Sequence, residues 1–226
     1  MSESTVQRPV ALGQPAPDFD LPLVEPEGRV TLGGFLGTRP LLLALFRGLA
    51  CPFCRRLVAT TKQRAAALDG VGVDTLAVTA TPLKAARLYA RYRPAGLPLA
   101  SDPWYRVHRA YGVPLVEISQ DEPSDWPARI HIDDAMKTPI NPTGELPEPL
   151  PVPIAGDALD KLDKFEAIET DEDKAPGGSL ALSGYFLIDR AGIVRWRFVE
   201  AIDSLSEYGQ YPNADEMLQA AQDLAA

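Results

Sequence analysis

One segment constrains the fold of this chain more than any other: a buried strand that leads directly into two cysteines and a helix. Leu41–Phe46 is a continuous apolar run between turn signals, which is typical of a strand covered on both faces. The loop that follows reads Arg47-Gly-Leu-Ala-Cys51-Pro-Phe-Cys54, and apolar residues then recur at helical spacing to about Leu68. The sequence therefore predicts strand, cysteine loop and helix in succession.

Short apolar runs and helical patterns alternate through the first half of the chain, and a hairpin and a helix close it. Further strands are expected at Val73–Val78, Leu97–Ala100, Tyr185–Asp189 and Ile193–Val199, and further helices from Pro82 to about Tyr92 and over Trp104–Tyr111 and Ala214–Leu224. Strands joined by helices run parallel, whereas a hairpin adds antiparallel strands. We therefore expect an α/β fold, a three-layer α/β/α sandwich with a mixed central sheet.

A long acidic and proline-rich insertion interrupts this pattern at residues 117–178. Sixteen acidic and five basic residues lie between Glu117 and Lys174, and nine of the 22 prolines lie in the insertion. Alternating prolines in 147–153 favour extended polyproline II, so we expect little regular structure apart from one helix near Asp157–Ile168. The insertion is either a solvated loop, as its Asp171–Lys174 charge run suggests, or a segment that covers the active site or docks a partner.

The two cysteines are the candidate catalytic residues. Partial positive charge at a helix start stabilises a thiolate there, and Arg47 and Arg55 are near enough in sequence to add positive potential. The spacing of Cys51 and Cys54 lets one thiol attack a substrate and the other resolve the mixed disulfide.

Three other interpretations of the pair compete with redox chemistry. A purely structural disulfide would close too short a loop to restrict the unfolded chain much. Half of an intersubunit zinc site would have only His108 and His131 as further ligands in the chain. His108 is more simply interpreted as a packing or capping residue, and His131 and Trp126 are the residues of the insertion that could approach the thiols. Two core cysteines without a role remain the third interpretation, although proline between them at a strand-to-helix junction is specific.

Composition limits the partners and the location. The net charge of −9 argues against nucleic acid and anionic membrane surfaces as partners. The first residues lack a basic start followed by an apolar stretch, and no apolar run is long enough for a membrane span. At 226 residues we expect a single domain, residues 1–226, that contains the insertion, and a cytoplasmic location.

Several motifs resemble the peroxiredoxin-like members of the thioredoxin superfamily, the alkyl hydroperoxide reductase and thiol-specific antioxidant group. They are Leu12-Gly-Gln-Pro-Ala-Pro-Asp-Phe-Asp-Leu-Pro, Val30-Thr-Leu-Gly-Gly-Phe-Leu-Gly, the cysteine loop, Ser101-Asp-Pro with Ala110-Tyr-Gly-Val, and Tyr185-Phe-Leu-Ile-Asp-Arg-Ala-Gly-Ile-Val-Arg195. The resemblance covers about 1–116 and 180–226 and implies a thioredoxin-like fold.

The cysteine loop departs from the motif of that group, Pro-x-x-x-Thr-x-x-Cys. In alignment the proline becomes Arg47, the threonine becomes Cys51, and the peroxide-attacking cysteine becomes Cys54. The second active-site arginine of the group falls at Ser183, and the cis-proline of the thioredoxin branch is missing from the same region. A peroxiredoxin-like mechanism makes Cys54 the nucleophile, whereas a thioredoxin-like mechanism makes Cys51 the nucleophile, and the sequence leaves both open.

The resemblance implies a thiol–disulfide oxidoreductase or peroxiredoxin-like antioxidant protein that cycles Cys51 and Cys54 between dithiol and disulfide. Its substrate would be a hydroperoxide or a protein disulfide, its reductant a thioredoxin- or glutathione-type system, and it would need no metal or organic cofactor. The family is compatible with a homodimer. Two alternatives belong to other classes: a non-catalytic binding protein that uses the acidic insertion, and a protein that binds copper(I) through the two thiolates.

Overall fold

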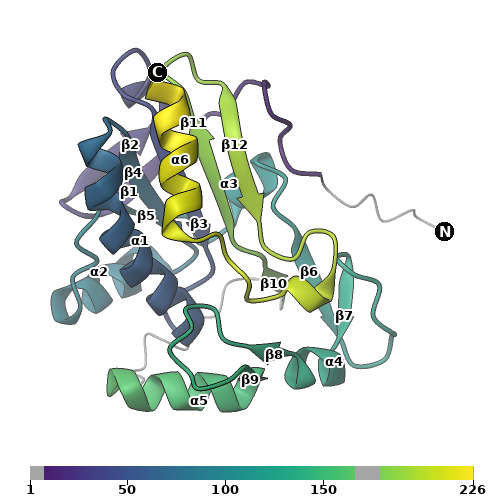
Figure 1. Ribbon diagram of the computed structural model, residues 1–226. Helices are drawn as coiled ribbons and strands as arrows, with labels where there is room; N and C mark the ends of the chain where they lie inside the picture. Colours follow the sequence, from purple (N-terminus) through teal and green to yellow (C-terminus); the bar gives the residue numbers. More distant parts are fainter. Residues whose placement is uncertain (1–7, 166–178, 226) are drawn as a thin grey trace.

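A computed structural model of the chain describes residues 8–165 and 179–225 and is built on a seven-stranded sheet, ordered β12-β11-β3-β4-β5-β1-β2 (Figure 1). Its strands are β1 (Asp20–Glu25), β2 (Gly28–Thr31), β3 (Leu41–Phe46), β4 (Asp74–Thr79), β5 (Leu99–Ser101), β11 (Gly184–Ile188) and β12 (Val194–Val199). The three central strands β3, β4 and β5 are parallel, and β11 and β1 pair antiparallel to β3 and β5. The sheet is therefore mixed, as expected.

Alternate residues of β3 enter two separate hydrophobic cores. Leu41, Leu43 and Leu45 belong to one core, while Leu42, Ala44 and Phe46 belong to the other. The second core is closed by buried residues of α1 (Pro52–Gly70), α2 (Leu83–Tyr92) and α6 (Ala214–Ala225). The first core is closed by α3 (Arg106–Ala110) and by residues of the insertion. A continuous apolar strand is thus buried on both faces, and the three-layer thioredoxin-like fold is confirmed.

The elements expected from periodicity form within a few residues of their expected bounds. β3 matches the predicted strand residue for residue, and α6 begins after Asn213, whose side-chain Oδ1 accepts the Glu216 N–H at 2.8 Å. The hairpin of β1 and β2 was not predicted from the sequence, because Pro22 lies inside the β1 run and a proline argues against a strand.

The expectation of little regular structure in residues 117–178 was wrong for its described part. This region and its flanks form β6 (Leu115–Ser119), β7 (Arg129–His131), α4 (Ile132–Lys137), β8 (Pro139–Ile140), β9 (Leu150–Pro151), α5 (Val152–Asp163) and β10 (Ser179–Ala181). Strand β6 pairs with both β10 and β7, so a small second sheet anchors the insertion at its two ends.

The prolines are compatible with these elements because of where they fall. Pro151 pairs with Pro139 in a two-stranded ladder and then precedes α5, and Pro153 lies in the first turn of α5, where a missing N–H costs no hydrogen bond. Helix α5 begins five residues before the predicted Asp157–Ile168 helix and ends where Lys164 takes a left-handed conformation. The end of that predicted helix and the Asp171–Lys174 charge run lie outside the described residues. No helix in the described part combines the length and apolar character of a membrane span.

Candidate active site

The loop after β3 places both cysteines at the start of α1, as predicted. Cys51 is the residue that precedes the helix and Cys54 lies in its first turn. Both are free thiols; Cys54 has no solvent-exposed surface, whereas Cys51 is partly exposed. Of the two cysteines, Cys51 is therefore the one with solvent-exposed surface.

Two threonines after β4 hold the cysteine loop in place. Thr79 donates its hydroxyl to the Arg47 carbonyl at 2.8 Å, and the Thr81 hydroxyl accepts the Leu49 N–H at 2.6 Å. The Cys51 N–H donates to the Gly48 carbonyl at 3.1 Å, which tightens the turn into the helix. The position of Cys51 is thus set by backbone contacts that a change of its own side chain would leave intact.

The two thiols have opposite shifts of pKa. A hydrogen bond with the Cys54 side chain, together with the charge of Arg47 and the N–H groups of Phe53 and Cys54, lowers the pKa of Cys51 to about 6 despite partial burial. Burial, followed by contact with the Cys51 sulfur, raises the pKa of Cys54 well above its ordinary value. At neutral pH the arrangement holds a thiolate on Cys51 and a thiol on Cys54.

Arg47 supplies the positive charge nearest the thiols. Its Nη1 lies 3.2 Å from Oε2 of Glu200 and 3.2 Å from the Ala181 carbonyl, and its guanidinium lies 5.4 Å from the centre of the Tyr208 ring. Its Nε and Nη2 are buried and have no hydrogen-bond partner among the described residues. The guanidinium is therefore bound through Nη1, and its Nε and Nη2 donors stay unpaired near the thiols.

Glu200 organises this side of the site. Its Oε2 also accepts the Ser183 N–H at 3.0 Å, and its Oε1 accepts the Gly209 N–H at 3.1 Å. Ser183 is the position that the resemblance aligns with the second active-site arginine of the peroxiredoxin-like group, and the Glu200 carboxylate brings the Arg47 guanidinium next to that position. The sequence analysis did not identify Glu200 or Tyr208; an acidic residue directly after the β12 strand was the one available signal.

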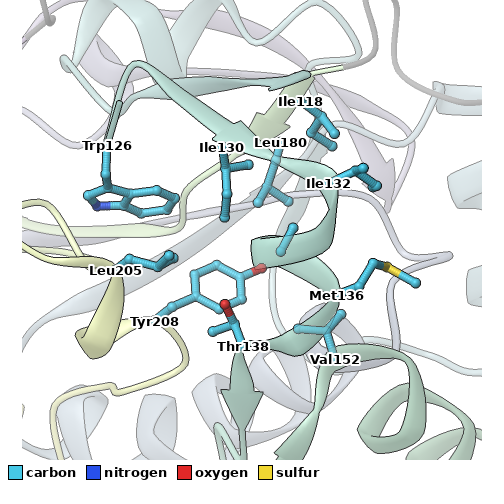
Figure 2. A pocket seen from close by; sticks show the side chains of 11 residues that line it. Ile118, Trp126, Ile130, Ile132, Met136, Thr138, Val152, Leu180, Leu205 and Tyr208 are labelled. Carbon is cyan, nitrogen blue, oxygen red and sulfur yellow. The ribbon is translucent and has the colours of Figure 1, made fainter. Parts of the chain in front are cut away.

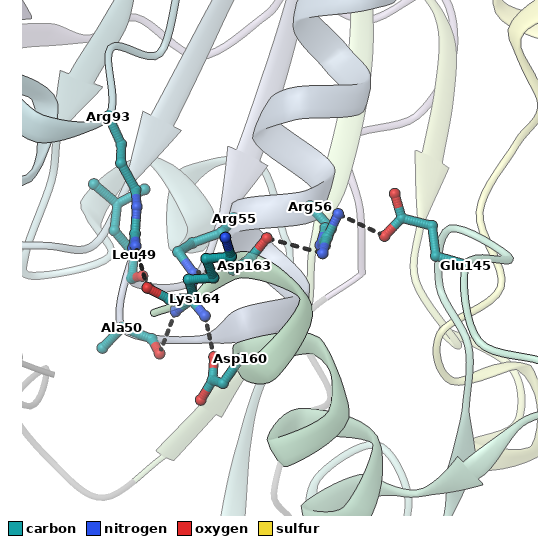
Figure 3. A network of polar contacts seen from close by, with 9 residues as sticks. All are labelled: Leu49, Ala50, Arg55, Arg56, Arg93, Glu145, Asp160, Asp163 and Lys164. Atoms are coloured by element: carbon teal, nitrogen blue, oxygen red, sulfur yellow. Dashed lines mark hydrogen bonds and ion pairs between the residues drawn. The ribbon is translucent and has the colours of Figure 1, made fainter. Parts of the chain in front are cut away.

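Arg55 points away from the role that the sequence analysis gave it. Its guanidinium pairs with Asp160 and Asp163 of α5 and donates to the carbonyls of Leu49 and Ala50, at 3.2 and 3.0 Å (Figure 3). It is not among the main causes of the pKa shift of either cysteine. Arg55 therefore ties the cysteine loop to the insertion and is a positioning residue.

Further contacts hold the insertion against α1. Arg56 pairs with Glu145 at 2.9 Å and with Asp163 at 2.8 Å, and the Arg93 Nη2 donates to the Lys164 carbonyl at 3.2 Å (Figure 3). A Cβ on Gly156 of α5 would lie 3.5 Å from Pro52 of the cysteine motif. Of the two interpretations of the insertion, the contacts favour the one in which it adjoins the active site.

The remaining candidate residues have structural surroundings. His108 is completely buried and its ring packs edge-on against Tyr105 at 5.0 Å, and His131 accepts the Asp133 N–H at the start of α4. Trp126 donates its indole N–H to the Ala201 carbonyl at 2.7 Å. No group of three or more His, Cys, Asp and Glu side chains placed to hold a metal ion occurs in 8–165 or 179–225.

Solved structures with the same fold include a peroxidoxin, a peroxiredoxin and a putative thiol:disulfide interchange protein. The chain is similar to the peroxidoxin BcpB from Mycobacterium tuberculosis (15% identity, 94% of this chain and 97% of that chain covered, TM-score 0.54) and to the reduced 2-Cys peroxiredoxin from Plasmodium vivax (17%, 94% and 81%, 0.57). It is also similar to a putative thiol:disulfide interchange protein DsbE from Chlorobium tepidum (17%, 96% and 99%, 0.50). At these identities the likeness shows the fold.

A search of curated protein sequences gives no significant match. The model of the AhpC/TSA family matches residues 12–197, which includes the cysteine loop, Arg47 and most of the sheet. The structural neighbours agree with that assignment. The chain belongs to the AhpC/TSA family, the peroxiredoxin-like branch of the thioredoxin superfamily.

Proposed function

We propose that this protein is a thiol–disulfide oxidoreductase in which Cys51 is the attacking thiolate and Cys54 the resolving thiol. The observation that carries the proposal is the contrast between the two sulfurs. Cys51 is partly exposed at the helix start with its pKa lowered to about 6, whereas Cys54 is fully buried with its pKa raised. This contrast supports the thioredoxin-like assignment of roles over the peroxiredoxin-like one.

The reaction proceeds in two exchanges. The Cys51 thiolate attacks one sulfur of a substrate disulfide, forms a mixed disulfide and releases the other half as a thiolate. Cys54 then loses its proton and attacks the Cys51 sulfur, which releases the second half as a thiolate and leaves a Cys51–Cys54 disulfide. The neighbouring Arg47 guanidinium favours the charged form of Cys54 in this second exchange.

A dithiol reductant completes the cycle. Two electrons and two protons from a thioredoxin-type protein, or from two glutathione molecules, return the pair to the dithiol. The family membership supports this class of reductant. A cytoplasmic location, where such systems are reducing, remains our prediction.

Hydroperoxide reduction at Cys51 is a second candidate, favoured by the free Arg47 donors. Nε and Nη2 of this buried guanidinium can hydrogen-bond a peroxide oxygen. The Cys51 thiolate would attack the peroxide, take its OH group to become a sulfenic acid, and release an alkoxide that takes a proton from water to become the alcohol. The Cys54 thiol would then condense with the sulfenic acid, forming the disulfide and water.

Single-turnover assays of two matched variants test both activities. With bis(2-hydroxyethyl) disulfide or hydrogen peroxide, Cys51→Ser should lose the reaction and Cys54→Ser should complete one turnover, trapping a mixed disulfide or a sulfenic acid on Cys51. The reverse pattern would assign the attack to Cys54. Negligible reaction of the reduced protein with either substrate, together with a Cys51 pKa near 8.5, would favour a binding protein instead.

A further inference from the structure

An apolar pocket lies in the part of the molecule built by the insertion, and one of its lining residues, Tyr208, contacts Arg47 of the active site. It has a volume of about 150 Å³, and the residues around it come from β6, β7, α4, the start of α5, β10 and the short 3₁₀ helix Leu205–Glu207 (Figure 2). Its walls include Ile130, Val152 and Leu180, and the partly exposed side chains of Ile118 and Met136 lie at its rim. The pocket is therefore reachable from solvent.

Tyr208 connects the pocket to the reactive centre. The Tyr208 side chain lines the pocket, and the Arg47 guanidinium lies 5.4 Å from the centre of the Tyr208 ring. Burial is the main cause of the raised pKa of Tyr208, and Glu200 and the two cysteines make smaller contributions in the same direction. On another side, Val152 of the wall precedes by four residues the Gly156 that adjoins Pro52.

The polar atoms of the lining leave little for water to bind. The Trp126 indole donates to the Ala201 carbonyl, and the Thr138 hydroxyl donates to the Asp134 carbonyl. The Tyr208 hydroxyl is directed into the pocket, whose other lining side chains are mostly apolar (Figure 2). A buried water needs two to four polar partners, whereas a dry apolar cavity of this volume accommodates one benzene-sized ring.

We infer that this pocket is a substrate-binding site for one aromatic ring or compact branched alkyl group, carried by the disulfide that Cys51 attacks. The reaction in this inference rests on the proposed function, whereas the binding of the ring rests on the pocket alone. Burial of the ring against Ile130, Leu180 and Tyr208 holds the substrate while its disulfide lies at Cys51. Small organic disulfides with such a group are then preferred to fully polar ones.

Binding is tested first, with toluene as a probe that undergoes no thiol chemistry. In protein labelled at the methionine methyl groups, toluene should shift the Met136 resonance and leave Met217, in the opposite core, unchanged. Ala135→Leu fills the pocket and should abolish the shift, whereas Ala67→Leu, the same change on an exposed face of α1, should retain it. No toluene-dependent shift of Met136 in the unaltered protein would overturn the inference.

Selectivity is tested with two disulfides that differ by one group. Benzyl 2-hydroxyethyl disulfide should react with a kcat/KM about tenfold higher than bis(2-hydroxyethyl) disulfide, and Ala135→Leu should reduce that ratio to within about twofold of one. Leu180→Phe, a second filling variant, should do the same. Equal rates for both disulfides in the unaltered protein would overturn the substrate role. Loss of reaction with both, while toluene still binds, would instead overturn the proposed function.

Discussion

Arg47 and Glu200 form an ion pair that is closed off from solvent, with 3.2 Å between Nη1 and Oε2 and side-chain exposures of 6% and 0%. The Glu200 carboxylate also accepts the N–H groups of Ser183 and Gly209, so both of its oxygens are hydrogen-bonded within the protein. The Arg47 guanidinium in turn lies beside both cysteines. One buried pair thus links the stability of the protein to the charge at its thiols.

Removal of the carboxylate should be costly. Glu200→Ala leaves the Arg47 guanidinium buried without its counter-charge, so we expect the free energy of unfolding in urea to fall by about 3–5 kcal/mol. Asp20→Ala, which breaks the exposed pair with Arg29, is the control and should change it by less than about 1 kcal/mol. Equal small losses in both variants would show that the buried pair contributes no more than a surface pair.

The hydrogen bond from Cys54 should control the pKa of Cys51, because it is the largest cause of the lowered value. Cys54→Ala removes the donor, and we expect the pKa of Cys51 to rise from about 6 toward the ordinary value near 8.5. Cys54→Ser keeps a hydroxyl donor and should give a smaller rise. The pH dependence of iodoacetamide alkylation measures both values, and identical midpoints for the two variants would contradict this cause.

The elements with strong local patterns were predictable from the sequence. Leu41–Phe46 has no polar residue and is bounded by turn signals, so its burial on both faces follows from the sequence alone. The placement of Cys51 and Cys54 at a helix start follows from the same segment. By contrast, β6 and β7 are short, and their parallel pairing, which sets Glu117 opposite Arg129, is a contact that no local pattern encodes.

The partners of the site arginines were not predictable for the same reason. Arg47 meets a carboxylate 153 positions away, and Arg55 meets one 105 positions away. Proximity in sequence suggested that both arginines face the thiols. The first turn of α1 instead directs Arg55 toward α5, and Arg47 is the arginine whose charge acts on the two sulfurs. Long-range packing, which depends on the whole fold, decides such directions.

His108 should make the protein sensitive to acid. Burial, with the charges of Arg47 and Arg109, lowers the pKa of His108 to about 3, whereas in the unfolded chain it is near 6.5. Between these values the unfolded chain binds a proton that the folded protein does not, so the free energy of unfolding falls as the pH falls from 6.5 toward 3.

His108→Leu should remove this sensitivity. From pH 7 to pH 5, the unaltered protein should lose about 2 kcal/mol more stability in urea than His108→Leu does. His131→Gln, which alters the residue that caps α4, should lower stability at both pH values and keep the acid-dependent loss. An equal loss in the unaltered protein and in His108→Leu would show that other groups cause the acid sensitivity.

The ion pair of Arg55 with Asp160 should hold α5 over the cysteine loop. Asp160→Asn removes the carboxylate charge and leaves Arg55 with Asp163 at 3.5 Å, so we expect about fivefold faster amide exchange in α5 and faster alkylation of Cys51. Asp157→Asn, one turn earlier on α5 at an exposed position without an ion pair among the described residues, is the matched control and should leave both rates unchanged. Equal rates of amide exchange in α5 and of Cys51 alkylation in the Asp160→Asn and Asp157→Asn variants would contradict this role of the ion pair. The apolar contacts of Ala155 and Leu159 would then hold α5 in place without the charges between the insertion and α1.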